Sequence, residues 1–463
     1  MEPLSFVLSQ LTFVLFGAPA AFHPSIRPMG WPARIAASFG LGAIVLTLEA
    51  MLFSLCGLRW GNRTLAIPLV LIAAIISWRL RKHPAEPRRP LRPNVLTGLL
   101  AGSLIAVTLL LFVHALVIGT ATSVEFVLFE GTKAVRFAVA KGFDANFLRS
   151  PFSVHTHPGA PPLFPATLSW FALGREEPMW TWAPLSAAIW LMASIPLVLE
   201  LLRRVLHDTV ALTATAFWTV AMAAALTHAH SAGTADASWL FYGTVAFAAL
   251  LTERGSGAST PLAAGALSGL ALTKSGGVLF SLILVAVFAT STFIVSRKSL
   301  HPAFSRSVGR LAIVFTAPLF SAGLWGVFLI VNHLALRDPS AGSFSLWSSR
   351  WWEAVAGSET AALHAGTWGL AFIIPATVIL LSVRHWNGWM LAGVIFVSAA
   401  MAIASITYMK EWTDPTDLIA TTFPHLMQWP LSILIITAGF AQRRDHELFA
   451  TDTSEKPARF QQS

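Results

Sequence analysis

Apolar runs of nearly membrane-spanning length alternate with short polar connectors from residue 4 to residue 440. A helix needs roughly 20 mostly apolar residues to cross a bilayer, so these runs predict membrane-spanning helices. Several runs are shorter than this, and we expect their helices to continue into the polar neighbours. About thirteen spans are expected: residues 4–19, 35–58, 65–78, 95–119, 182–202, 210–226, 237–251, 262–272, 278–295, 311–331, 369–381, 391–406 and 431–440.

The composition supports this interpretation, because 55% of the 463 residues are hydrophobic and only 11% are charged. Too little polar material remains to cover a soluble globule of this size. We therefore predict an all-α polytopic membrane protein, with one transmembrane domain over residues 1–445 and a polar cytoplasmic tail over 446–463. The lone Cys56 excludes disulfides and cysteine metal sites. The N-terminus lacks the basic region of a cleavable signal, so we expect the first apolar run to be retained.

The net charge of +9 comes from Lys and Arg clustered in short loops between the apolar runs. In a soluble protein such a charge would suggest nucleic acid, but here it follows the rule that basic loops stay in the cytoplasm. The pattern predicts a multi-pass protein of the inner (plasma) membrane, with a cytoplasmic C-terminus and no nucleic-acid partner. The basic loops are residues 79–92, 203–204, 297–310, 384 and 443–444.

If the basic loops lie in the cytoplasm, the other loops lie on the external face of the membrane. Nearly all remaining charged residues are then on that external face. This topology requires the apolar piece 163–173 to be re-entrant and residues 262–295 to form a hairpin whose apex faces out. One extra crossing in that region is the alternative, and it would reverse everything downstream. The external loops are residues 120–179, 227–238, 332–367 and 407–429.

The first external loop is charged, His-bearing and rich in Pro, so we interpret it as the catalytic loop. Within residues 124–140, Glu125 and Arg136 return to the same helix face, and Glu130 and Lys133 are three apart. An amphipathic helix on the membrane surface is expected, a surface helix with internal ion pairs being the alternative. Its apolar side is predicted to consist of Val127, Leu128, Val135 and Val139.

His155 and His157 open a proline-stiffened turn that ends at Pro165. Prolines at this position hold the two imidazoles at a fixed depth before the chain re-enters the bilayer. Two histidines without a spaced third ligand are weak evidence for a metal. We therefore favour contact with a phosphate or an acceptor and predict no metal site here.

Asp236 and Lys274 each stand directly against an apolar run, where a charge needs a partner. Asp236 is placed as the N-cap of the next helix, a role that is compatible with ligand binding. Beside Lys274, Gly276 and Gly277 open the backbone and would admit a phosphate. Snorkelling of Lys274 to the interface is the alternative.

Short motifs are spread over most of residues 95–430. They are Glu125, Lys133-Ala134, His157-Pro158 with Pro161-Pro162-Leu163, Gly233-Thr234-Ala235-Asp236, Thr273-Lys274-Ser275-Gly276-Gly277, and Thr416-Asp417-Leu418 with His425. The series resembles bacterial members of the GT-C class of polytopic glycosyltransferases, a branch related to the protein mannosyltransferase and aminoarabinose transferase-like superfamily. The chain departs from that pattern in having Glu125 for Asp, Glu130 for an aromatic residue, no acid after Lys274, and His425 for Arg.

The resemblance implies a GT-C-like fold with external juxtamembrane helices and a polyprenyl-phosphate sugar as donor. Glu125 would deprotonate the acceptor hydroxyl, with inversion and loss of polyprenyl phosphate, while Asp236 would orient the acceptor. The acceptor would be a glycan, a lipid or a protein. No cofactor is firmly implied, and a divalent cation at Asp236 stays open. Substrate would be bound by Lys133, Arg136, His155, His157, Lys274 and His425.

Two other functions remain open at this point. A lipid-linked sugar transporter would need charged residues along a path through the membrane, and apart from Glu49 the sequence offers none. A relative that has lost catalysis and only binds the lipid carrier is compatible with the missing acid near Lys274.

Overall fold

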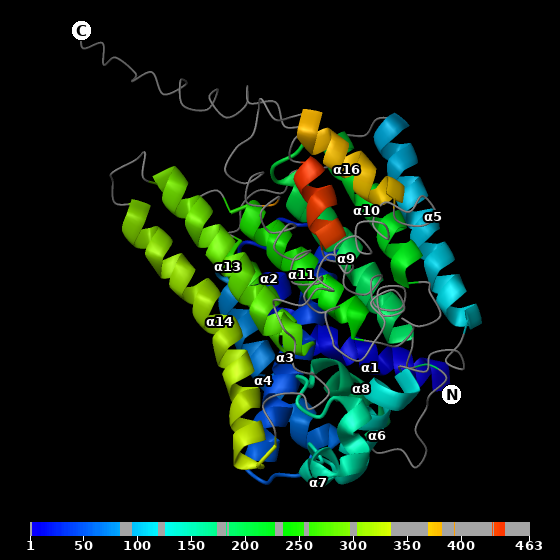
Figure 1. Cartoon of the computed structure of the whole chain (residues 1–463), viewed down its shortest axis with the longest axis vertical. Helices are drawn as coiled ribbons and strands as arrows, with labels where there is room; N and C mark the ends of the chain where they lie inside the picture. Colours follow the sequence, from blue (N-terminus) through cyan, green and yellow to red (C-terminus); the bar gives the residue numbers. More distant parts are fainter. Residues whose placement is uncertain are drawn as a thin grey trace, which may run out of the picture.

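The computed structural model describes residues 2–83, 95–118, 126–173, 182, 185–226, 235–253, 259–296, 303–334, 369–381, 393, 428 and 430–439. Every regular element in these ranges is helical, as expected for the all-α class (Figure 1). The elements are α1 (Glu2–Phe16), α2 (Ala18–Phe22), α3 (Trp31–Leu55), α4 (Asn62–Arg81), α5 (Val95–Ile118), η2 (Phe126–Glu130), α6 (Gly131–Ala140), α7 (Ala145–Arg149), η3 (Pro151–Thr156), α8 (Leu163–Ala172), α9 (Leu185–Arg203), α10 (Asp208–Leu226), α11 (Asp236–Leu251), α12 (Thr260–Ala271), α13 (Ser275–Ser296), α14 (Ala303–Val331), α16 (Gly369–Leu381) and a helix over Pro430–Gly439.

Within the described ranges, four helices are long and apolar enough to cross a membrane, namely α3, α4, α9 and the Val308–Val331 part of α14. Shorter apolar helices occupy most of the other expected spans. On α4, Ile67, Leu71, Ile75 and Trp78 are each more than half exposed. Large apolar side chains repeated at this helical spacing on one face suit a lipid environment rather than water. Most of the expected span 391–406 and the whole tail 446–463 lie outside the described residues.

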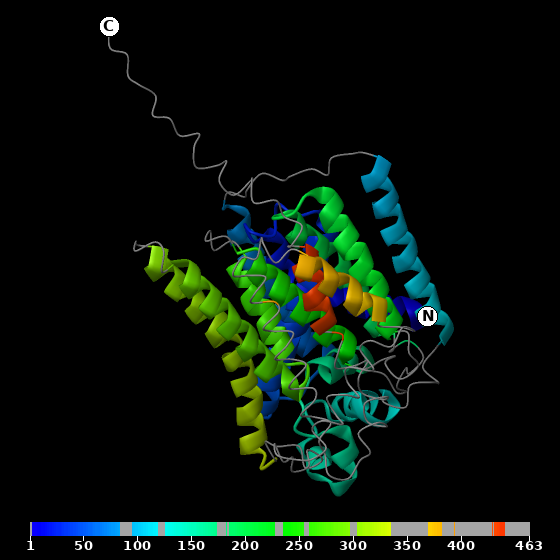
Figure 2. The same ribbon diagram turned by 45° about the horizontal axis from the view of Figure 1, so that its top comes forward.

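The short helices α6, α7 and α8 gather at one end of the helix bundle, which we call the site end (lower end in Figure 1, and again in Figure 2). The expected re-entrant piece forms α8, which is buried over nine of its ten residues. At about 15 Å, α8 is too short to cross a bilayer. Ser169 Oγ of α8 donates to the carbonyl oxygen of Ala134 in α6 at 3.0 Å, so α6 packs on a buried helix.

The expected hairpin over residues 262–295 consists of α12 and α13, joined at Lys274. The carbonyl of Leu272 accepts from the backbone N–H of Leu163 at 2.9 Å, which places the apex beside the start of α8 at the site end. α11 begins at Asp236 and runs for 16 residues, about 24 Å, away from this level.

At the other end of α11, near Glu253, hydrogen bonds and an ion pair connect the basic loops. We call this end of the helix bundle the basic end. Arg310 pairs with Glu253 at 3.5 Å, and Glu253 Oε2 accepts from the backbone N–H of Ser259 at 3.0 Å. Arg204 donates to Ser259 Oγ at 3.0 Å and also to the carbonyl of Ser25. Nearby, Arg27 donates to the carbonyls of Arg81 and His83 at 3.3 and 2.9 Å. Three of the predicted basic loops therefore meet at one end, far from Asp236.

Close contact between α1 and α3 gives a test of this packing. A Cβ on Gly42 would lie 1.8 Å from the carbonyl oxygen of Phe13, whereas a Cβ on Gly102 of α5 would meet nothing within 4 Å. We expect Gly42→Ala to cost roughly 1–3 kcal/mol, because the helices must separate. Gly102→Ala should be neutral or slightly stabilising, since Ala has the higher helix propensity. Thermal-unfolding midpoints of the purified variants measure the difference, and equal midpoints would contradict the packing.

Candidate functional site

Residues 126–140 cover the segment expected to lie as an amphipathic helix on the membrane surface, and one face of this segment is buried in the protein. It begins with the π-helical turn η2 and continues as α6. Of the predicted apolar side, Val127, Leu128 and Val139 are 50%, 49% and 72% exposed, as the lipid-facing side of a surface helix would be. The buried face instead consists of Phe126, Gly131, Lys133, Ala134 and Phe137.

Glu130 closes this π-helical turn and carries a carboxylate oxygen shielded from solvent. The residue as a whole is half-buried, but its Oε2 is buried without a hydrogen-bond partner. Burial raises the pKa of Glu130 above its ordinary value; Asp236 adds to the rise, whereas Lys133, Lys274 and His157 oppose it. An acid near four charged or titratable groups with an uncommitted oxygen suits proton transfer.

Asp236 and Lys274 form an ion pair at the site end. The Asp236 side chain is only 1% exposed, while that of Lys274 is 34% exposed. Lys274 Nζ also lies 5.3 Å from the ring centroid of Trp239. The expectation that Asp236 caps α11 was wrong: Ala235 holds the N-cap position, and Asp236 is the first helical residue. There, the positive end of the helix dipole favours its charge.

His157 has a left-handed backbone, with φ of 50°. Its carbonyl accepts a hydrogen bond from Lys133 Nζ at 2.8 Å, and its ring lies 5.2 Å from that of Phe129, the neighbour of Glu130. Lys133 is 3% exposed. Backbone strain of this kind persists only where the surroundings enforce it, and it is common at functional sites. The two motifs that the sequence separates by 24 residues are thus joined by one hydrogen bond.

The two glycines after Lys274 have different roles from those expected. A Cβ on Gly277 would lie 1.9 Å from the carbonyl oxygen of Leu270, so this glycine allows α12 and α13 to approach closely. It does not provide open backbone for a phosphate. A Cβ on Gly276 would meet only the Phe280 ring, at 3.7 Å. Close helix packing therefore requires a glycine at Gly277 but not at Gly276.

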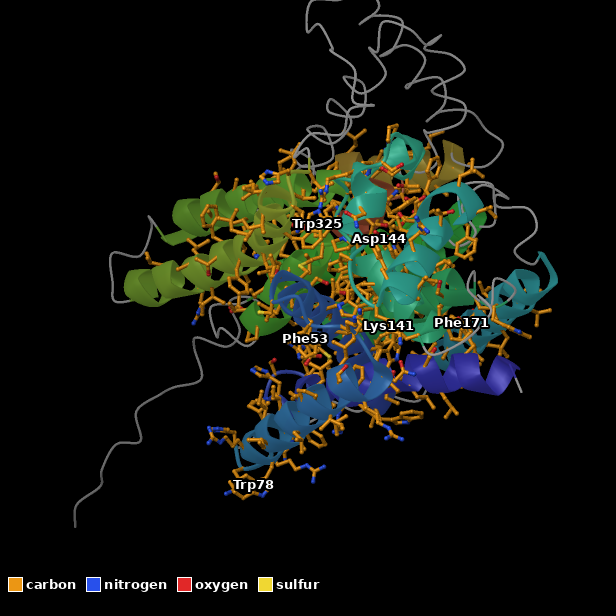
Figure 3. All side chains as sticks on the ribbon, turned by 90° about the horizontal axis from the view of Figure 1, so that it is seen from below. Phe53, Trp78, Lys141, Asp144, Phe171 and Trp325 are labelled. Atoms are coloured by element: carbon orange, nitrogen blue, oxygen red, sulfur yellow. The ribbon has the colours of Figure 1, made fainter. Side chains whose placement is uncertain are left out.

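Arg136 stands apart from this cluster. It pairs with Asp144 at 3.7 Å, its guanidinium lies 4.9 Å from the Phe147 ring centroid, and its side chain is 51% exposed. Figure 3 looks onto this end of the molecule and labels Asp144, Lys141 and Trp325 there. Asp144 also caps α7 by accepting from the backbone N–H of Phe147 at 2.9 Å. The contacts of Arg136 thus join α6 to α7.

Of the other predicted residues, Glu125 and His425 lie outside the described residues, as does the side chain of His155. Within the described part of the chain, no group of three or more His, Cys, Asp or Glu is placed to hold a metal. Sequence reasoning missed Glu130 as a site residue and treated it as a departure from a family pattern. The spacing of Glu130 and Lys133 placed both on one helix face, but it gave no sign that Glu130 is shielded from solvent.

The structure therefore brings together Lys133, His157, Asp236 and Lys274 from the sequence prediction, and adds Glu130. Two carboxylates and two ammonium groups converge where α6, α11 and the α12–α13 apex meet. Such a set can accept a proton and offset negative charge that develops on a leaving group. Comparison with protein-family models, curated proteins and solved structures finds no match.

Proposed function

We propose that the protein is a membrane glycosyltransferase of GT-C-like architecture, with about thirteen spans and its site on the external face of the inner membrane. It would transfer a sugar from a polyprenyl-phosphate donor to a hydroxyl of a glycan, lipid or protein acceptor, with inversion. The observation that carries the proposal is the shielded, uncommitted oxygen of Glu130 beside Lys274 and Lys133.

In the proposed reaction the acceptor oxygen forms a bond to the anomeric carbon as its proton passes to a carboxylate. The bond from that carbon to the phosphate oxygen breaks, and its electron pair leaves with polyprenyl phosphate. Glu130 is the described carboxylate suited to take the proton, because its raised pKa makes it a better base than an exposed acid. Glu125, five residues upstream, stays the base that the family resemblance implies.

Lys274 is the cation best suited to the leaving phosphate. It is partly exposed, whereas Lys133 is buried and bonded to the carbonyl of His157. Asp236 would act as a positioning residue, since it holds the ammonium group of Lys274 at the site. A lysine presents a compact charge to phosphate, which matches a headgroup that arrives and leaves in every cycle.

The first test replaces Glu130. Glu130→Gln keeps the shape of the side chain but cannot take a proton, so we expect transfer to fall by about 10²–10⁴-fold. Wild-type activity should fall as the pH drops through the raised pKa of Glu130, because only the ionised form accepts a proton. Glu130→Asp should retain part of the activity with a displaced acidic limb. Release of polyprenyl phosphate from synthetic donors provides the measurement. Loss of activity in Glu125→Gln with full activity in Glu130→Gln would assign the base to Glu125 instead.

Glu130 should also limit stability. Because its folded-state pKa is raised, the neutral carboxyl is tolerated at low pH, and stability is lost as the pH rises through that pKa. Glu130→Gln should therefore melt at a higher temperature than wild type at neutral pH, with the gap closing below pH 4.5, the ordinary value of the group. Melting curves of wild type and Glu130→Gln, recorded from below pH 4.5 to neutral pH, measure this difference. A gap that does not change with pH would argue against a buried ionisable carboxyl.

The third test uses polyprenyl phosphate, the product common to every donor of this class. Wild-type protein should bind it, and Lys274→Met should bind it at least about tenfold more weakly, since one charge-assisted contact contributes roughly 1.5–3 kcal/mol. Lys141→Met, at the exposed end of α6, is the matched control and should bind like wild type. If all three proteins bound polyprenyl phosphate equally, or if wild type did not bind it, the proposal that Lys274 holds the donor phosphate would be wrong.

A further inference from the structure

A cavity of about 490 Å³ lies among α2, α3, α4, α11 and α12. Its lining is apolar except for His23 and Tyr242, and the Tyr242 hydroxyl already donates to the carbonyl of Gly40 at 2.7 Å. On α4 the lining extends from Leu69 to Leu80, a length of about 16 Å. Protein interiors contain few voids larger than a water molecule, and an apolar void does not hold water. An elongated apolar cavity of this size calls for an apolar occupant.

The cavity opens on the side of α4 that carries the exposed apolar residues. Ile72 and Ile76 line the cavity and are nevertheless 53% and 41% exposed, while Leu69 and Ala73 beside them are 8% and 4% exposed. The opening is thus framed by side chains that suit contact with hydrocarbon. A lipid chain can enter from the bilayer without passing through water.

Three arginines surround the end of the cavity formed by Ala20, His23 and Leu80. The guanidinium groups of Arg81 and Arg34 lie 4.2 and 5.9 Å from the ring centroid of Phe22, which stands between Ala20 and His23 in the chain. Arg27 donates to the carbonyl of Arg81 at 3.3 Å. Within the described ranges, no ion pair involves these three arginines. Burial lowers the pKa of His23, so the charge at this rim comes from the arginines.

We infer that the cavity binds one acyl chain of an anionic glycerophospholipid, with the lipid phosphate held by Arg27, Arg34 and Arg81. The cavity is long, apolar and open toward the bilayer, which suits a lipid acyl chain. The three arginines at its end suit a negatively charged headgroup. The cavity belongs to the basic end, whereas the candidate catalytic residues belong to the site end. The inference therefore stands independently of the proposed reaction.

Gly265 provides the variant that tests the cavity. It lines the cavity, and an added Cβ there would meet nothing within 4 Å, so Gly265→Leu places a larger side chain at the cavity wall from a position with room for its Cβ. Gly323→Leu on α14 is the matched control, since Gly323 is exposed, also has open space, and does not line the cavity. Native mass spectrometry of the full chain, titrated with phosphatidylglycerol or phosphatidylcholine of identical chains, is the measurement.

We expect wild type and Gly323→Leu to retain one phosphatidylglycerol and to prefer it to phosphatidylcholine. Gly265→Leu should lose this bound lipid while keeping its unfolding temperature. Arg34→Gln and Arg81→Gln should each reduce the preference about fivefold, the effect of one basic residue near an anionic headgroup. Equal retention by Gly265→Leu, or equal binding of the two lipids by wild type, would overturn the inference, as would a cavity occupied by detergent only.

Discussion

The ion pair between Asp236 and Lys274 is the interaction on which the site end depends. Asp236 is almost fully buried, and a buried carboxylate without a cation is strongly destabilising. The pair fixes the α12–α13 apex against the start of α11. The apex in turn presents the Leu272 carbonyl to Leu163, where α8 begins. Through α8 and the His157 carbonyl bonded to Lys133, the same constraint reaches α6 and Glu130.

Much of the fold was predictable from the chain because a bilayer imposes simple rules. Apolar runs gave helices, and the basic connectors around Arg81, Arg204 and Arg310 were correctly assigned to one end. The α12–α13 hairpin followed from the same charge pattern. The buried face of residues 126–140 was not predicted, because it depends on contact with α8, a segment distant in the sequence. Periodicity identifies side chains that share a face, but not which face packs against the rest of the protein.

Part of the candidate site was also predictable, for a different reason. Asp236 and Lys274 were identified because charges next to apolar runs need partners, and the structure supplies each with the other. Glu130 was missed because a single acid in a polar loop has no distinguishing pattern until its burial is known. The assignment of Gly277 to ligand binding failed similarly. A glycine beside a cation looks the same in sequence whether it admits a phosphate or a neighbouring helix.

The acidic side chains of the described ranges include two groups. One group is paired with basic residues, and the other has a shielded carboxylate oxygen without a hydrogen bond. Asp144, Glu200, Asp208, Asp236 and Glu253 each have a basic partner. Glu49 and Glu130 instead keep a shielded oxygen without a hydrogen bond. Glu49 lies within the apolar helix α3, whereas Glu130 has lysines and a histidine within electrostatic reach. An uncommitted oxygen can take up a proton, and nearby cations keep its ionised form accessible. In the proposed reaction, proton transfer beside a departing phosphate would need both properties, and among these acids Glu130 combines them.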